Sequence, residues 1–411
     1  METSRDLALR LLAALVAIAF ADIALGAAQA VTAASSRPCR VVNETQQKHF
    51  APDSGDALTE AIASANPDDQ LEITGTCTGI YALNQNIVLT GIPTKQFPVP
   101  TLDGGHAWST LTVAAGVTGM LTGLTITGGI GGEPDVINGT PGPGGGIDNR
   151  GDLTLISCFI RGNTAVFGGG IVNSGTLVLI SSAVSGNRAL GSGGNGGGIG
   201  NSGSLVLRGA SLVSGNVAEN VGGGIHNTST GSATISESSI VSGNISGDFG
   251  GGLMNSGTLT IDASSITGNR SQFGGGGIHN GVNRTVIVRN SSTISDNIVN
   301  FDGAGILNHG NLVVTSSTVS GNSGIGSGGG INNSGGVVTF NSSVLRGNTN
   351  GLGGGLFNDL NGTVTFNSSS VIENTATTSG GGIYNAAGTV SLATTSVTGN
   401  VPDNCIGVPG C

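Results

Sequence analysis

The stretch Gly-Gly-Gly-Ile-His-Asn decides the fold because the chain repeats it: "GGGIHN" stands at 222–227 and again at 275–280. Its general form, Gly-x-Gly-[Ile/Leu]-x-Asn, recurs ten times, and the 236 residues from Asn149 to Asn385 (385 − 149) give about 26 residues for each of nine steps. The ten asparagines are Asn149, Asn173, Asn201, Asn227, Asn255, Asn280, Asn308, Asn333, Asn358 and Asn385. A repeat of this length predicts a solenoid, in which each repeat packs only on its neighbours.

The sequence between the repeated motifs has the alternation of β-strands. In "GTLVLISSAVSGN" (175–187), apolar and small residues alternate with period two, and no helical period occurs after residue 66. Each repeat therefore supplies a short Ile-centred strand, a Thr-Leu-x-Leu strand and a Ser-x-Val strand, separated by Gly and Asn turns. Three short parallel strands per repeat predict an all-β fold, a right-handed parallel β-helix.

A second asparagine, usually within "SGN" or "TGN", follows each motif and aligns two further columns. Three residues before it stands an unbroken aliphatic column, from Ile160 and Val184 to Val397. Five residues before it stands a column of Ser or Thr, which Cys158 opens. Both columns share the inward face, so we expect hydroxyl ladders, asparagine ladders at the corners, and a Cys158 that is a buried, unreactive thiol.

Segments at both ends differ from the repeats. Residues 1–30 have the layout of a cleaved signal peptide, with two arginines, a short apolar run and an Ala-x-Ala exit, which predicts a secreted or cell-surface protein. Residues 31–70 form an N-terminal segment with a short amphipathic helix that covers the first coil. Residues 71–400 form the β-helix of about 12 coils, and 401–411 a C-terminal disulfide cap.

Five cysteines fit an oxidising compartment. Their positions suggest the pairs Cys39–Cys77 and Cys405–Cys411, with Cys158 single, although spacing alone leaves the connectivity open.

The motifs "LTEAIASAN" (58–66), "ITGTCTG" (73–79), "TLDG" (101–104) and "LTGLTITGG" (121–129), followed by the GGGI and SGN repeats, resemble bacterial right-handed β-helix proteins of the pectin-lyase-like superfamily. The repeats are also similar to those of chlamydial polymorphic outer-membrane proteins. The resemblance covers nearly all of the chain after the signal peptide. It implies the fold, but such coils serve adhesins and polysaccharide enzymes alike.

The overall composition narrows the possible partners. The formal charge is −10 with 9% charged residues, so no basic surface for nucleic acid is expected. The mean hydropathy of +0.20 and 37% apolar content predict a packed core. Beyond the signal peptide no apolar run is long enough to span a membrane, so the mature chain is expected to have no transmembrane segment.

The column that can contact a ligand is the outward residue between Ile and Asn in each motif. Its candidate ligand-binding members are His226, Met254, His279, Leu307, Asn332, Phe357 and Tyr384. They form either a partly apolar binding stripe or a face that glycine-rich loops cover. His226 and His279 stand two coils apart, about 9–10 Å, too far to share one metal ion.

No catalytic set stands out. Asp148 is the one carboxylate in the outward column, whereas Asp248, Asp302 and Asp359 lie near turns at differing offsets, so no stacked pair is evident. "RGD" at 150–152 matches "SGT" in the next repeat and is an ordinary turn, and the GxGxxG-like strings open no helix. No cofactor and no metal ion is expected.

The leading hypothesis is a non-enzymatic adhesion or glycan-binding rod, with an extracellular polysaccharide or cell-surface glycan as its partner. The alternative is a polysaccharide lyase or glycoside hydrolase on the same fold.

Overall fold

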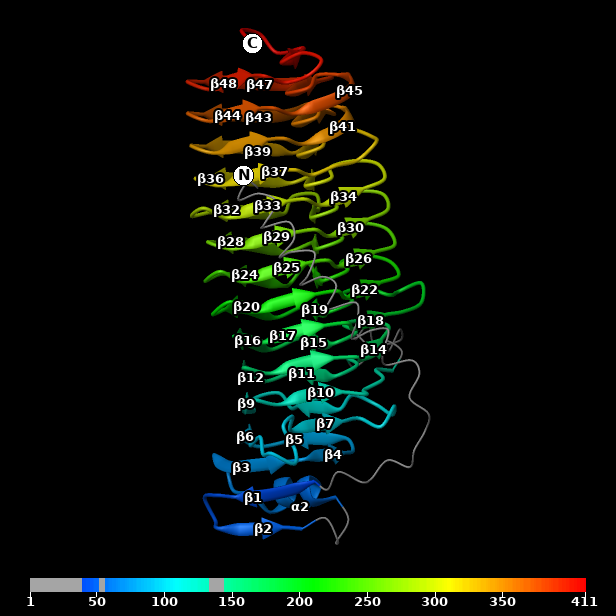
Figure 1. Ribbon diagram of the computed structural model, residues 1–411, viewed down its shortest axis with the longest axis vertical. Helices are drawn as coiled ribbons and strands as arrows, with labels where there is room; N and C mark the ends of the chain where they lie inside the picture. The colour runs from blue at the N-terminus through cyan, green and yellow to red at the C-terminus, as the bar shows by residue number, and fades with distance from the viewer. Residues whose placement is uncertain (1–38, 52–55, 133–143) are drawn as a thin grey trace, which may run out of the picture. The chain divides into compact units, whose positions relative to one another are not determined.

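The computed structural model of the chain describes residues 39–51, 56–132 and 144–411. The predicted signal peptide, residues 1–30, lies outside the described residues. The described chain is an all-β parallel β-solenoid of about 12 turns with one short helix, which confirms the predicted fold class. Figure 1 shows the turns stacked in chain order, from α2 at one end to β48 at the other.

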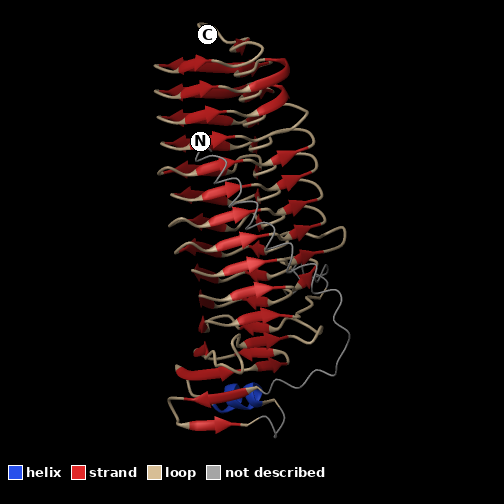
Figure 2. Ribbon diagram, viewed as in Figure 1, coloured by secondary structure: helices blue, strands red, loops and turns tan. Residues whose placement is uncertain are grey.

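One coil illustrates the others. The chain enters at β23 (Ile225–Asn227), continues through β24 (Ser232–Ile235) and β25 (Ile240–Ser242), and ends with the short β26 (Ile245–Ser246). A glycine-rich loop then leads to the first strand of the next coil. Each strand pairs in parallel with its equivalent one coil away, so that the coils build continuous sheets (Figure 2).

The first sheet contains the Ile-x-Asn strands. They are β5 (Tyr81–Leu83), β8 (Leu111–Val113), β11 (Ile147–Asn149), β15 (Ile171–Asn173), β19 (Ile199–Asn201), β23, β27 (Leu253–Asn255), β31 (Ile278–Asn280), β35 (Ile306–Asn308), β38 (Ile331–Ser334), β42 (Leu356–Asp359), β46 (Ile383–Asn385) and β49 (Cys405–Ile406).

The second sheet contains the longer Leu-x-Leu strands, and an antiparallel hairpin precedes them. The strands are β1 (Arg40–Asn43), β2 (Lys48–Phe50), β3 (Asp69–Thr74), β6 (Ile87–Gly91), β9 (Thr118–Thr122), β12 (Asp152–Ile156), β16 (Thr176–Ile180), β20 (Ser204–Arg208), β24, β28 (Thr258–Asp262), β32 (Thr285–Arg289), β36 (Asn311–Thr315), β39 (Val337–Asn341), β43 (Gly362–Asn367) and β47 (Gly388–Ala393).

The third sheet contains the Ser-x-Val strands. They are β4 (Thr76–Thr78), β7 (Thr101–Asp103), β10 (Thr125–Thr127), β13 (Phe159–Arg161), β17 (Ala183–Ser185), β21 (Leu212–Ser214), β25, β29 (Ser265–Thr267), β33 (Thr293–Ser295), β37 (Thr318–Ser320), β40 (Val344–Arg346), β44 (Ser370–Ile372) and β48 (Ser396–Thr398).

A fourth sheet, absent from the sequence prediction, follows the second asparagine of most coils. It consists of β14 (Thr164–Ala165), β18 (Arg188–Ala189), β22 (Val217–Ala218), β26, β30 (Arg270–Ser271) and β34 (Ile298–Val299), and a separate pair formed by β41 (Thr349–Leu352) and β45 (Thr375–Ser379). Only one residue of each two-residue strand is buried, such as Ala189, Ala218 and Val299. Two residues are too few for an alternation to be visible in the sequence.

The predicted inward columns line the core. The Ile or Leu of every Gly-x-Gly motif is fully buried, and so is the aliphatic column up to Val371. The hydroxyl column forms a ladder in which a backbone N–H bonds the hydroxyl of the next coil; Ser182, for example, donates to Ser211 Oγ at 3.2 Å. Cys158 is buried and free, its backbone N–H joins the ladder at Ser182 Oγ (3.0 Å), and burial raises the pKa of its thiol to about 11.

Both asparagine ladders are present. In the first, Nδ2 of each motif asparagine donates to Oδ1 of the next, from Asn149 to Asn385, with distances of 2.7–2.9 Å. In the second, both the backbone N–H and Nδ2 of an asparagine reach Oδ1 of the next at 2.9–3.1 Å, as between Asn244 and Asn269. The amide groups are buried, and a buried amide without a hydrogen-bond partner destabilises the fold. These bonds provide the partners.

The glycines of the motif are there for two reasons. Gly222 has a φ of +67°, a left-handed conformation that side chains disfavour. Gly224 is limited by space instead, because a Cβ atom there would stand 2.7 Å from the carbonyl oxygen of Gly252 in the next coil.

Different devices close the two ends of the stack. Helix α2 (Ala57–Ser64) begins at Asp56, whose carboxylate accepts the N–H of Leu58 and Thr59, and it packs Leu58 and Ala61 onto the core at the first coil. The disulfide Cys39–Cys77 joins the N-terminal segment to the first coil, and Cys405–Cys411 closes the C-terminal segment, so both predicted pairs are confirmed. Within the described residues, no helix has the length and apolar character of a membrane span.

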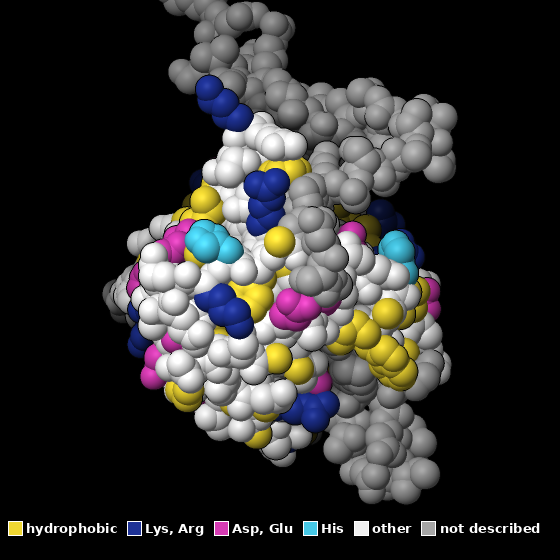
Figure 3. All heavy atoms as spheres, turned by 90° about the horizontal axis from the view of Figure 1, so that it is seen from below, with side chains coloured by type: hydrophobic (Ala, Val, Ile, Leu, Met, Phe, Trp, Pro, Cys, Tyr) yellow, Lys and Arg dark blue, Asp and Glu magenta, His cyan; other side chains and the backbone are white. Residues whose placement is uncertain are grey.

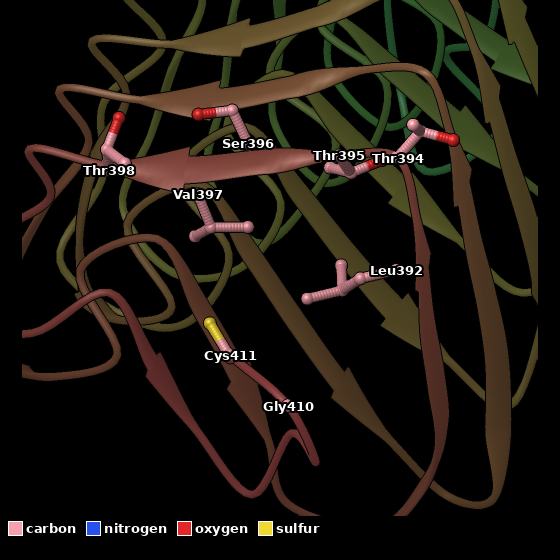
Figure 4. A pocket seen from close by; sticks show the side chains of 8 residues that line it. All are labelled: Leu392, Thr394, Thr395, Ser396, Val397, Thr398, Gly410 and Cys411. Atoms are coloured by element: carbon pink, nitrogen blue, oxygen red, sulfur yellow. The ribbon is translucent and has the colours of Figure 1, made fainter.

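The last coil is less buried than the coil before it. Strand β49 covers β46, but β47 and β48 end their sheets, and Leu392 and Val397 are half-exposed where the equivalent residues of the previous coil are buried. Figure 4 shows both side chains pointing toward the segment with Gly410 and Cys411, across a hollow of about 590 Å³. The hollow is lined by residues of the last coil and of the C-terminal segment.

Candidate functional site

The outward column of the first sheet lies beneath the glycine-rich loops that connect the coils. Of its predicted ligand-binding residues, His226, Met254, His279 and Tyr384 are half-buried. The other three are buried: Leu307 is 6% exposed, Asn332 4% and Phe357 9%. The structure thus aligns all seven in neighbouring strands.

Phenylalanines from the loops cover the two histidines of the column. Phe167 meets His226 edge-on with ring centroids 5.7 Å apart, and Phe249 meets His279 at 5.0 Å. Burial lowers the pKa of His226 to about 4, and burial together with His309 lowers that of His279 to about 3, so both rings are neutral at pH 7. Nδ1 of each ring has no hydrogen-bond partner.

Three phenylalanines from the loops of consecutive coils, Phe249, Phe273 and Phe301, form a row that is here called the aromatic edge. Phe249 and Phe273 have ring centroids 6.0 Å apart, and Phe273 stacks on Phe301 at 5.7 Å with an interplanar angle of 18°. Phe273 is 40% exposed and Phe301 48%. In Figure 1 the loops that carry these residues project from one side of the stack, next to β26, β30 and β34.

The fourth sheet extends the apolar surface beside the aromatic edge. Its outward residues Ile245, Arg270 and Ile298 lie in register on adjacent strands, and all three are exposed. Two isoleucines and one arginine thus face solvent side by side next to the aromatic edge.

A sequence signal for the aromatic edge exists. The chain has 11 phenylalanines, and four of them, Phe167, Phe249, Phe273 and Phe301, come one or two residues before a glycine turn. The sequence prediction concentrated on the residue after the glycines and missed this position. The distance from the phenylalanine to the glycine turn varies by one residue between repeats, so the phenylalanines do not align as a clear column in the sequence.

Next to the aromatic edge, the structure brings Asp302 and Asp359 within electrostatic reach of each other. Burial raises the pKa of Asp302, the N–H of Ser327 lowers it, and the charge of Asp359 raises it further. The two carboxylates come from coils two repeats apart, and Asp302 reaches out from a loop. For this reason, no stacked pair of carboxylates at equal offsets is visible in the sequence.

Asp148, the one carboxylate of the outward column, forms an ion pair. Asp148 Oδ2 accepts Nη2 of Arg150 at 2.7 Å, so the arginine of the "RGD" string pairs within its own strand and turn. Among the described residues, no group of three His, Cys, Asp or Glu side chains converges as for a metal ion.

Charged side chains are sparse on the surface. In the view from below, at the end that carries α2, lysines, arginines and acidic residues are scattered among uncharged polar groups (Figure 3). A chain with 9% charged residues has few ways to recognise a strongly charged partner at this end.

Comparisons with known proteins give one distant structural likeness. No family model matches the chain, and no curated protein matches it. Among solved structures, the Dettilon tailspike protein (gp208) is similar at 12% identity and a TM-score of 0.25, over 82% of this chain and 64% of that one. The chain thus spans about two thirds of the length of that structure. The resemblance to the pectin-lyase-like superfamily and to polymorphic outer-membrane proteins remains a prediction, and the fold itself rests on the observed stack of coils.

Proposed function

We propose that the protein is an exported, non-enzymatic β-solenoid that binds a glycan along the aromatic edge. The observation that carries the proposal is the row of Phe249, Phe273 and Phe301, whose neighbouring ring centroids are 5.7–6.0 Å apart and whose side chains are partly exposed. The exposed parts of these rings form an apolar strip that runs over consecutive coils, about 4.8 Å apart along the stack, and the apolar C–H groups of sugar rings pack against such a strip.

The composition of the surface favours a neutral or sparsely charged polysaccharide. The chain carries a formal charge of −10, which repels a polyanion. Arg270 is the exposed cation between Ile245 and Ile298, and it suits a hydroxyl-rich ligand or an isolated carboxylate.

In this proposal, the outward column lies beneath the loops that carry the aromatic edge. Leu307, Asn332 and Phe357 are buried, and His226 and His279 lie beneath Phe167 and Phe249, so these residues carry the loops and do not contact the glycan. Met254 and Tyr384 are partly exposed. Export is proposed from the signal-like residues 1–30, and the two disulfides are consistent with an oxidising, extracellular environment.

Alanine variants of the aromatic edge test the proposal. The purified protein is screened on a glycan array, and affinities for the bound glycans are measured for wild type, Phe273→Ala and Phe301→Ala. Each variant is expected to bind about tenfold more weakly, since an aromatic stacking contact contributes about 1–3 kcal/mol. Phe159→Ala is the matched control, because Phe159 is 51% exposed on the third sheet, away from the edge. Equal binding by all four proteins, or no glycan bound by wild type, would refute the proposal.

Polysaccharide cleavage is the second candidate, and Asp302 with Asp359 is the observation in its favour. A carboxyl group with a raised pKa beside a second carboxylate is the arrangement that acid catalysis of glycoside hydrolysis uses. Incubation with acidic and neutral polysaccharides, with assays for new reducing ends and for unsaturated products of a lyase, tests it. Sustained turnover that Asp302→Asn abolishes would establish the enzyme and end the purely binding hypothesis.

A further inference from the structure

Two residues that stand just before a glycine turn pack over the outward column of a following coil: Phe249 over His279, and Phe167 over Gly200 and His226. Asp302 occupies the same position before the turn at Gly303, and the outward residue of the coil that follows is Asn332. The loop residue here is therefore a carboxylate and the outward residue an amide.

Ser327 links Asp302 and Asn332. Oδ1 of Asp302 accepts the N–H of Ser327 at 2.8 Å, and Nδ2 of Asn332 points to the carbonyl oxygen of the same residue at 3.5 Å. Asn332 is only 4% exposed, and its Oδ1 has no hydrogen-bond partner. A buried amide oxygen without a donor costs about 1–3 kcal/mol unless something fills the place of the donor.

Asp359 completes the group from the next strand. Strand register pairs Asn332 with Phe357 and Ser334 with Asp359, which makes Asp359 a diagonal neighbour of Asn332 on the outward side. Its Oδ1 is buried and also has no partner. The ion pairs among the described residues involve Asp148 and Asp262, so no cationic side chain neutralises Asp302 or Asp359.

We propose that Asp302, Asn332 and Asp359 bind a divalent cation, and that calcium fits them best. All three side chains present oxygen, two of the oxygens are buried without a donor, and carboxylate and amide oxygens are the ligands that Ca²⁺ takes in flexible sites of six to eight ligands. Bound there, the ion neutralises two carboxylates that repel each other and fixes the Asp302 loop to the coils beneath it. This site is independent of the glycan-binding proposal.

Calcium titration of the full chain tests the site. After removal of metal ions with a chelator, CaCl₂ alone is titrated by calorimetry, with MgCl₂ as the comparison ion, and Tm is measured with and without each salt. Wild type is expected to bind one Ca²⁺ with a dissociation constant of about 10⁻³ M or lower, in the range of extracellular calcium modules. Its Tm is expected to rise by about 2–4 °C.

The isosteric variants Asp302→Asn and Asp359→Asn, made singly and together, distinguish a loss of calcium binding from a loss of folded structure. Without calcium the double variant should melt at or above the temperature of metal-free wild type, because the carboxylate repulsion is gone, yet calcium should neither bind it nor shift its Tm. Asp248→Asn, beside Phe249 in an equivalent loop, is the matched control and should behave as wild type. A wild type that neither binds calcium nor gains stability at about 10⁻³ M, or a double variant that responds like wild type, would overturn the proposal.

Discussion

At the scale of the residue, the buried asparagines carry the hydrogen bonding that joins one coil to the next. Oδ1 of Asn244 accepts both the backbone N–H and Nδ2 of Asn216, each at 3.0 Å, and its own Nδ2 donates to Val213 O and to Asn269 Oδ1. A single side chain therefore satisfies groups in three coils. Neither a shorter side chain nor a carboxylate can replace it, because the site needs a donor and an acceptor together.

Asn244→Ala is expected to lower the free energy of unfolding by about 3 kcal/mol, since it leaves several buried amide groups without partners. Urea denaturation followed by circular dichroism measures the change. Asn84→Ala, at an exposed position outside the ladders, should change it by less than about 0.5 kcal/mol. An Asn244 variant as stable as the Asn84 variant would show that the ladder contributes little.

His226 and His279 make the stability of the fold depend on pH. Their pKa values in the folded protein, about 4 and about 3, lie below the ordinary value of 6.5, so between these limits the unfolded chain binds more protons. The contribution of the two neutral histidines to the free energy of unfolding is fully present above about pH 6.5. It falls as the pH drops toward 4, by up to about 1.4 kcal/mol per pH unit for each histidine. Urea midpoints at pH 7 and pH 5 should differ less in the double variant His226→Leu/His279→Leu than in wild type; an equal difference would assign the acid sensitivity to other groups.

At the scale of the element, the glycine turns set how closely adjacent coils approach. Two glycines that serve the same coil show the two constraints separately. Gly224 stands against Gly252 O and the side chain of Asn244, whereas Gly243 has a φ of +61° and open space around it. The first needs the absence of a side chain, and the second needs only a left-handed backbone.

Gly224→Ala should therefore destabilise the protein more than Gly243→Ala. The Gly243 variant costs about 1–2 kcal/mol for the left-handed backbone, and Gly243→Asn should recover part of that cost, because Asn tolerates this conformation. The Gly224 variant must move the backbone of the next coil and should cost more than about 3 kcal/mol. Thermal melting of the three variants ranks them, and a Gly224→Ala protein that melts above Gly243→Ala would contradict the close contact.

At the scale of the whole molecule, the two ends of the stack differ in how well they are closed. Leu58 of α2 is fully buried at the first coil, whereas Leu392 and Val397 of the last coil are half-exposed. In a solenoid each coil is held by its neighbours, so a coil with one neighbour opens more readily.

Hydrogen exchange followed by mass spectrometry should show this asymmetry. Amides of β47 and β48 are expected to exchange faster than those of β43 and β44, one coil further in, and faster than those of β28 and β29 in the middle of the stack. Strand β5, against which α2 packs, should exchange slowly. Uniform protection along the stack would mean that the chain opens only as one unit.

Much of this architecture was predictable from the sequence, because a repeat displays the same inward residues many times. The Ile, Val and Ser columns and both asparagine ladders follow from alignment of the repeats alone. The fourth sheet did not, since its strands have two residues, and Phe249, Phe273 and Phe301 did not, since their loops vary in length. Asp302 and Asp359 stand 57 residues apart (359 − 302), and only the stacking of coils together with the reach of a loop brings them close.

The first asparagine ladder has a direction, and this bears on how such a chain can change in length. Every Nδ2 donates toward the C-terminal neighbour, and Oδ1 of the first member, Asn149, has no partner, because Val113 precedes it in register. A duplicated repeat inserted anywhere between Asn149 and Asn385 brings one donor and one acceptor, and so preserves the pattern on both sides. Gene duplication or loss in whole units of about 26 residues is therefore neutral for the bonding of the stack, whereas a change by a fraction of a repeat breaks both ladders at once.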